Sequence, residues 1–233
     1  MFTIGILQCG RAPEELIERH GDYDTMFQRL LGFDGFAFTP YAVLDGVFPA
    51  HVHAADGWLI TGSRFAVYED HPWIAPLEDF LREAYALGVP IVGVCFGHQI
   101  LAQALGGTVE KYAGGWSVGQ IAYALMHGDP LRLAAFHQDQ VTRPPSGATV
   151  TGSAVRCRYA FLRYGERAMS MQPHPEFSDA YLRDLMAARA DILPDAVLRM
   201  AAASTPRLGD TSRIAETIRD FFTMLRGAAG QDG

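Results

Sequence analysis

The sequence predicts an α/β fold in which a mostly parallel central sheet carries helices on both faces. Through the first 107 residues, short apolar runs typical of strands alternate with segments whose apolar residues recur every three or four positions, as on one face of a helix. The run at 89–94 is apolar throughout, which is typical of a parallel strand covered on both sides. A glycine-flanked cysteine directly after this run predicts a nucleophile elbow at the turn from strand to helix.

The first half of the chain supplies the elements of this sheet in order. The expected strands are residues 2–7, 35–43, 58–60 and 89–94. The expected helices are residues 13–30, 74–87 and 97–106. The first of these follows Pro13, a residue type favoured at helix starts, and Gly88 follows the second as an expected C-terminal cap.

Beyond residue 107 the pattern changes, and the second half predicts shorter strands followed by helices. Strands, some of them antiparallel, are expected at residues 108–111, 118–126, 148–157 and 167–172. Helices are expected at residues 179–190, 194–203 and 211–226. The small and polar residues 227–233 are expected to form a disordered tail, and residues 1–233 are interpreted as a single domain.

Composition and charge argue against several classes of function. The net charge is −7 and no basic cluster is present, so nucleic acid is not an expected partner. The three cysteines form no CxxC pair, which argues against a disulfide framework or a thiolate zinc site and favours a reducing compartment. The apolar N-terminus lacks the basic region of a signal peptide, and no apolar run approaches the roughly 20 residues of a membrane span. We therefore expect a cytoplasmic protein without membrane association, bound metal or cofactor.

The segment Gly93-Val94-Cys95-Phe96-Gly97 has the spacing of a nucleophile elbow. In such a turn the nucleophile is held in a strained conformation, and its close neighbours must be glycine so that the backbones can pass. Cys95 is expected at a helix N-terminus, where the helix dipole favours a thiolate, and the backbone N–H of Phe96 is then free to bind an oxyanion. Cys9 and Cys157 lack this context, and we interpret them as buried structural residues.

A second candidate segment is Gln172-Pro173-His174-Pro175-Glu176. Each proline biases the residue before it towards an extended conformation, and residues two apart in an extended segment face the same side. His174 and Glu176 are therefore expected to lie side by side, with the carboxylate orienting the imidazole. This is the arrangement that a base and its orienting group need to activate a nucleophile.

Taken together, these segments resemble the class I glutamine amidotransferases, whose structures are flavodoxin-like α/β folds. The resemblance lies in Val94-Cys95-Phe96-Gly97-His98-Gln99 followed much later by His174-Pro175-Glu176. Thr61-Gly62-Ser63 resembles the oxyanion loop of that family. His137-Gln138-Asp139-Gln140-Val141 resembles a segment of the amidotransferase domains of GMP synthase type.

The resemblance implies an enzyme that hydrolyses the side-chain amide of glutamine through a glutamyl thioester and needs no cofactor. The site residues that it implies are Cys95, His174 and Glu176 as the triad, Gly62 and Phe96 as backbone oxyanion donors, and Gln99, His137, Gln138 and Asp139 as contacts for the amino-acid end of the substrate. Two positions depart from the family pattern, because Thr61 and Gln138 each stand where relatives carry glycine. The γ-glutamyl substrate therefore need not be glutamine itself.

Three functions remain open from the sequence. The chain could be a glutaminase that passes ammonia to a separate synthetase, or a stand-alone hydrolase of γ-glutamyl peptides or amines. The third is a non-enzymatic regulatory or binding protein, against which the intact triad argues. Five aromatic residues either line the substrate pocket or pack in the core; these are Phe65, Tyr68, Trp73, Phe96 and Trp116.

Overall fold

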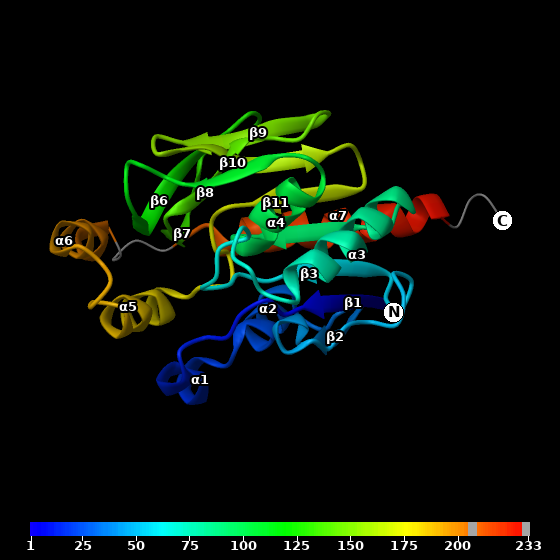
Figure 1. The fold of residues 1–233 in the computed structure, drawn as a ribbon, viewed down its shortest axis with the longest axis horizontal. Helices are drawn as coiled ribbons and strands as arrows, with labels where there is room; N and C mark the ends of the chain where they lie inside the picture. Colours follow the sequence, from blue (N-terminus) through cyan, green and yellow to red (C-terminus); the bar gives the residue numbers. More distant parts are fainter. Residues whose placement is uncertain (205–208, 230–233) are drawn as a thin grey trace.

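The molecule is built around one large sheet, seen in a computed structural model that describes residues 1–204 and 209–229. The nine strands follow the order β2-β1-β3-β4-β11-β10-β9-β6-β7 (Figure 1). The first five run parallel: β2 (Phe36–Tyr41), β1 (Phe2–Leu7), β3 (Gly57–Ile60), β4 (Ile91–Val94) and β11 (Ala168–Met171). This parallel half confirms the expected α/β fold, because parallel neighbours need the long crossovers that helices supply.

The sheet continues beyond β11 as an antiparallel half. Its strands are β10 (Cys157–Tyr164), β9 (Ala148–Ala154), β6 (Ser117–Leu125) and β7 (Leu131–His137). A separate pair is formed by β5 (Thr108–Lys111) and β8 (Asp139–Arg143). Strands β7, β8 and β10 are not predicted by the sequence pattern. Alanines occupy the buried middle of β7, arginines interrupt the apolar run of β10, and the expected strand at 148–157 is divided by a turn at residues 155–156.

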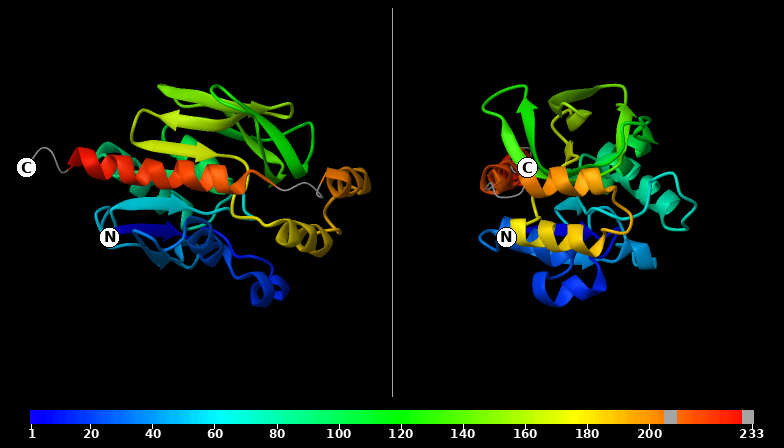
Figure 2. Two further views of the ribbon diagram at one scale, coloured as in Figure 1. Left: turned by 180° about the vertical axis from the view of Figure 1, so that it is seen from behind. Right: turned by 90° about the vertical axis from the view of Figure 1, so that its left-hand side faces the viewer.

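Helices cover both faces of the parallel half. Helices α3 (Ile74–Ala86) and α4 (Phe96–Ala104) lie on one face, and α2 (Tyr23–Leu31) and α7 (Thr211–Ala229) lie on the other (Figure 2). The side chains of each strand alternate between two apolar cores, so that Trp58 and Ile60 pack towards α3 and α4 while Leu59 packs towards α2 and α7. These strands are buried on both faces, as their continuous apolar runs predict.

The helix expected at 13–30 is wrong as a single element. The chain forms α1 (Glu14–His20) and then α2, separated by Gly21 and Asp22. Gly21 has φ of 81°, a conformation that ends a helix, and the Asp22 carboxylate accepts the backbone N–H of Tyr23 as a new N-cap. Because the apolar periodicity continues across this break, the sequence pattern does not distinguish the two helices from one.

The C-terminal helices complete the molecule. Helices α5 (Asp179–Ala188) and α6 (Asp195–Ser204) join α1 and the start of α2 in a third apolar core, which surrounds Phe177. Helix α7 continues through Ala229, three residues into the expected tail 227–233, and residues 230–233 lie outside the described part of the chain. Within the described ranges, no helix has both the length and the apolar character needed to cross a membrane.

Candidate active site

The elbow expected at Cys95 lies between β4 and α4. Cys95 has φ of 53° and ψ of −103°, and it is the one described residue other than glycine with positive φ. A Cβ atom on Gly93 would lie 2.4 Å from the carbonyl oxygen of Gly97, and one on Gly97 would lie 2.4 Å from the carbonyl oxygen of Ile60. No carbon–oxygen contact is that short, so only glycine fits on either side of the strained residue.

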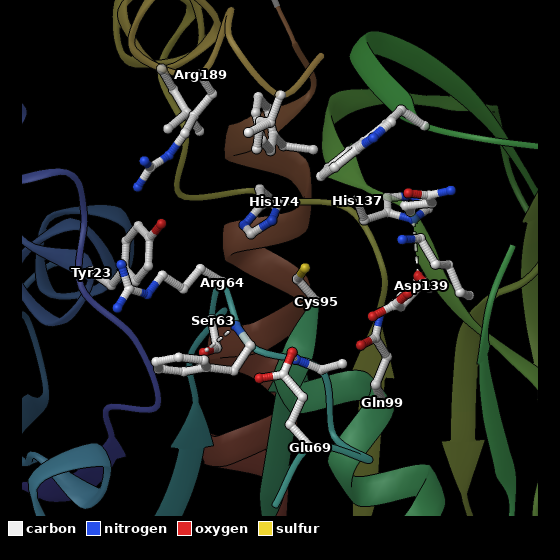
Figure 3. A pocket seen from close by; sticks show the side chains of 18 of the residues that line it. Tyr23, Ser63, Arg64, Glu69, Cys95, Gln99, His137, Asp139, His174 and Arg189 are labelled. Atoms are coloured by element: carbon white, nitrogen blue, oxygen red, sulfur yellow. Dashed lines mark hydrogen bonds between the residues drawn. The ribbon is translucent and has the colours of Figure 1, made fainter. Parts of the chain in front are cut away.

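His174 lies in the connection from β11 to α5 and points at Cys95 (Figure 3). Its backbone is extended and donates to the carbonyl of Ala134 at 2.8 Å, which fixes the segment against β7. The Nδ1 atom lies 2.7 Å from Oε1 of Glu176, as the spacing of the two residues predicts. The ring of Phe177 stacks on the imidazole at 3.9 Å between centroids and 7° between planes, so the imidazole is held on its face as well as at its edge.

The environment of His174 favours its charged form. Burial of the ring acts against the imidazolium, but the attraction of the Cys95 sulfur and the Glu176 carboxylate, with hydrogen bonds to both, outweighs it and raises the pKa of His174 to about 10. Glu176 is fully buried at its side chain, and its Oε2 atom has no hydrogen-bond donor among the described residues. The histidine is therefore a proton donor at neutral pH, next to the sulfur.

Gly62 lies against both Cys95 and His174. A Cβ atom on Gly62 would be 2.9 Å from Cε1 of His174 and 3.8 Å from Cβ of Cys95, so the loop after β3 closes over the cysteine and the histidine. The preceding Thr61 is fully buried, and its hydroxyl accepts the N–H of Cys9 at 3.0 Å and donates to the carbonyl of Gly62 at 3.0 Å. Thr61 thus ties this loop to the chain just after β1.

This double hydrogen bond predicts that Thr61→Val destabilises the protein. Valine has a similar shape but no hydroxyl, so the buried N–H of Cys9 and the carbonyl of Gly62 lose their partner. We expect the free energy of unfolding to fall by about 1–3 kcal/mol, measured by urea denaturation. Thr61→Ser keeps the hydroxyl and is the matched control. Equal losses in the two variants would show that the hydroxyl does not hold the loop.

A chain of hydrogen bonds made by side-chain amides ends at the sulfur of Cys95. Nε2 of Gln99 donates to the carbonyl of Asp139 at 2.8 Å and to Oε1 of Gln172 at 3.1 Å, and Nε2 of Gln172 lies 3.6 Å from Sγ of Cys95. Nδ1 of His137 contacts the same Asp139 carbonyl at 3.2 Å. Burial and the nearby His174 lower the pKa of His137 to about 3, so His137 is neutral where His174 is charged. The structure thus brings together Gln99, His137 and Asp139 beside Cys95.

Gln172 has a donor pointed at the sulfur, although the sequence motif gives it no role. We expect Gln172→Leu to slow the alkylation of Cys95 by iodoacetamide at pH 7 roughly tenfold, because a buried thiolate loses a hydrogen-bond donor. Gln140→Leu is the control, since Gln140 is also buried but donates to the carbonyl of Arg156. The same rate in Gln172→Leu as in the wild type would exclude this contribution.

These groups face a cavity of about 280 Å³. Cys95 and His174 are in its lining, together with Gln99, Gln138 and Asp139. Of the five aromatic candidates, Phe65, Tyr68 and Trp116 line the cavity, whereas Trp73 and Phe96 pack in the core. The Tyr68 hydroxyl donates to Oδ1 of Asp139 at 3.1 Å, a contact between a loop residue and the first residue of β8, 71 positions apart, that no sequence pattern indicates.

Comparison with known proteins agrees with this geometry. A family model described as glutamine amidotransferase class-I matches residues 51–186, a range that contains Cys95, His174 and Glu176. Gamma-glutamyl peptidase 2 of Arabidopsis thaliana is 25% identical over 233 residues, covering 93% of this chain and 94% of that protein. GMP synthase of Thermobifida fusca, described as glutamine-hydrolyzing, is 34% identical over 127 residues, covering 51% of this chain and 23% of that protein.

Solved structures show the same fold. A glutamine amidotransferase from Methylobacillus flagellatus superposes with a TM-score of 0.76 at 20% identity, covering 96% of this chain and 94% of that one. A second, from Thermotoga maritima, has a TM-score of 0.73 at 18% identity and covers 95% of each chain. The overall fold of this chain is therefore shared with these two structures.

Proposed function

Because the chain belongs to the class-I glutamine amidotransferase family, we propose that it hydrolyses the side-chain amide of a γ-glutamyl compound through Cys95, His174 and Glu176. The observation that carries this proposal is the position of His174. Its Nδ1 atom bonds to Glu176, and its other edge is directed at the sulfur of Cys95. A nucleophile, a base and an orienting carboxylate in this order can cleave an amide.

In the first half of the reaction, the Cys95 thiolate attacks the γ-carbonyl carbon. The new carbon–sulfur bond pushes the electron pair onto the carbonyl oxygen, which the backbone N–H groups of Gly62 and Phe96 would bind. When the tetrahedral intermediate collapses, the carbon–nitrogen bond breaks and the leaving amine takes the proton of His174. The products are a free amine and a glutamyl thioester on Cys95, with His174 neutral.

In the second half, His174 removes a proton from water as the water oxygen attacks the thioester carbonyl. The carbon–sulfur bond then breaks, which releases glutamate and restores the thiolate beside a protonated His174. The raised pKa of His174 applies to the resting enzyme, where the Cys95 sulfur and Glu176 face the ring, and it keeps on the imidazole the proton that the leaving amine takes in the first half. In this scheme Gln99, His137, Gln138 and Asp139 hold the amino-acid end of the glutamyl group.

For the leaving amine, we favour a γ-glutamyl amino acid or peptide over ammonia alone. This choice is supported by the match to gamma-glutamyl peptidase 2, which covers 94% of that protein, whereas the match to the GMP synthase of Thermobifida fusca covers 51% of this chain. The cavity also extends well past His174, which leaves room for a leaving group larger than ammonia.

The second candidate is a glutaminase that supplies ammonia to a separate synthetase. It is favoured by sequence identity, which is 34% to the GMP synthase against 25% to gamma-glutamyl peptidase 2. That GMP synthase is described as glutamine-hydrolyzing. In this case the acceptor of ammonia would be another protein, and the isolated chain would hydrolyse glutamine slowly.

The test is a turnover assay on the purified chain with glutamine, a γ-glutamyl amine and γ-glutamyl dipeptides, in which the released amine and glutamate are both quantified. We expect the dipeptides to be hydrolysed with a higher kcat/KM than glutamine. Weak turnover of glutamine alone would favour the second candidate. No turnover of any substrate, with no alkylation of Cys95 by a glutamine-like chloroketone, would reject both.

A further inference from the structure

The cavity has a second lobe on the far side of His174 from Gln99. Its lining includes Tyr23, Arg64, Phe177, Leu185, Arg189 and Ile192, which we call the arginine lobe. Figure 3 shows Arg64 and Arg189 extending towards it from opposite sides, while Gln99 and Asp139 lie on the other side of the Cys95–His174 pair. Arg64 and Arg189 also line an adjoining cavity of about 430 Å³, so the lobe is continuous with an outer groove.

The positive charges of this lobe lack acidic partners. Arg64 and Arg189 form no ion pair with any described carboxylate, and the Arg64 guanidinium lies 4.9 Å from the ring centroid of the neighbouring Phe65. Arg11, which lies beside them, is different because it pairs with Asp22 at 3.7 Å and with Asp45. Two guanidinium groups that face one cavity without an ion pair to a described carboxylate favour an anionic ligand.

Acidic residues lie near the lobe but are engaged elsewhere or lie at its outer margin. Glu69 accepts the N–H of Ala66 at 3.0 Å and contacts His71 at 2.8 Å. These contacts and the attraction of Arg64 hold the pKa of Glu69 below its usual value. Glu14 and Glu15 line the outer groove but not the inner cavity. The inner part of the arginine lobe therefore keeps a net positive charge.

The position of the lobe relative to the reacting atoms assigns its occupant. Arg64 follows Gly62 by two residues, so it comes from the same loop as the proposed oxyanion donor. The amine must leave next to His174, which supplies its proton. Since the glutamyl end is held at Gln99 and Asp139, the rest of the leaving group extends past His174 and Phe177 into the arginine lobe.

We propose that Arg64 and Arg189 bind the carboxylate of the leaving group, which makes γ-glutamyl amino acids and γ-glutamyl peptides the preferred substrates over γ-glutamyl amines. This assignment rests on the proposed hydrolysis at Cys95. A guanidinium matches a carboxylate with two parallel hydrogen bonds, and the walls formed by Phe177, Leu185 and Ile192 accept an apolar side chain. An uncharged leaving amine gains nothing from the two arginines.

The experiment compares γ-glutamylalanine with its C-terminal amide, two substrates that differ only in the carboxylate. The ratio of their kcat/KM values is measured for the wild type, Arg64→Gln, Arg189→Gln and the double variant. We expect the wild type to prefer the acid at least tenfold and the double variant to lose most of this preference. Arg183→Gln is the control. Arg183 lies on α5, the helix that ends at Arg189, but it is not part of the cavity lining, so this variant should keep the wild-type ratio.

A second readout separates this assignment from the proposed hydrolysis. The Kd values of the acid and the amide are measured by calorimetry in the Cys95→Ser variant, where no turnover is needed. Tighter binding of the acid, abolished by the two arginine substitutions, supports the assignment even if the enzyme proves inactive. Equal kcat/KM values for acid and amide in the wild type, together with equal Kd values in Cys95→Ser, would overturn it while leaving hydrolysis at Cys95 intact.

Discussion

Replacing Cys95 with serine is expected to lower turnover of every γ-glutamyl substrate by at least about 10⁴-fold, because a hydroxyl beside His174 is a far weaker nucleophile than a thiolate. The strained backbone at φ of 53° and the two glycine contacts that require it do not depend on the sulfur. The fold should therefore survive, and the thermal unfolding midpoint should stay within a few degrees of the wild type. The measurement is steady-state amine release, together with a thermal melt of both proteins.

The matched control is Cys157→Ala, which removes another buried cysteine but should keep kcat/KM close to the wild-type value. Burial raises the pKa of the Cys157 thiol to about 12 and holds that of Cys9 well above its usual value, so neither is a nucleophile at pH 7. Mass spectrometry after treatment with a glutamine-like chloroketone should find the label on Cys95. Retained turnover in Cys95→Ser, or a label on Cys157, would reject Cys95 as the nucleophile.

The parts of the fold that could be predicted from the sequence are those in which local pattern and tertiary environment agree. The run at 89–94 is apolar on both sides because β4 is covered by helices on both faces, and Gly93 and Gly97 mark the two backbone approaches around Cys95. In the same way, the prolines around His174 predict the extended segment that places it beside Glu176. Each of these signals is local, and each has a steric cause.

The remainder depends on contacts that no local pattern encodes. Helices α1 and α2 share one apolar periodicity, and only Gly21 with the Asp22 cap separates them. Strand β7 pairs with β6 and is largely buried although its centre is alanine, so its apolar signal is weak. Gln172 belongs to the same segment as His174, yet its contact with Cys95 follows from the way β11 is placed beside β4. Arg189 reaches the cavity because α5 ends there, which is a property of helix packing.

Replacing His174 with alanine is expected to lower kcat/KM by about 10⁴-fold. Replacing Glu176 with alanine should have a smaller effect, a loss of roughly 10²- to 10³-fold. The first change removes both the base and the proton donor for the leaving amine. The second leaves the imidazole in place, stacked on Phe177, but removes the 2.7 Å contact that orients it. Rates of amine release and of Cys95 alkylation measure the two effects, and wild-type activity in Glu176→Ala would remove Glu176 from the triad.

A third variant, Glu176→Gln, separates charge from orientation through the pH profile. Its amide oxygen can still accept from Nδ1 of His174, but the attraction that helps raise the pKa of His174 to about 10 is lost, so that pKa falls. Acylation needs the protonated imidazole, which is fully present well below this pKa and is lost as the pH rises through it. In Glu176→Gln the basic limb of kcat/KM should therefore move to lower pH, whereas Glu176→Asp, which keeps the charge, should retain a limb nearer that of the wild type. An unshifted basic limb in Glu176→Gln would mean that the carboxylate positions the ring without setting its charge.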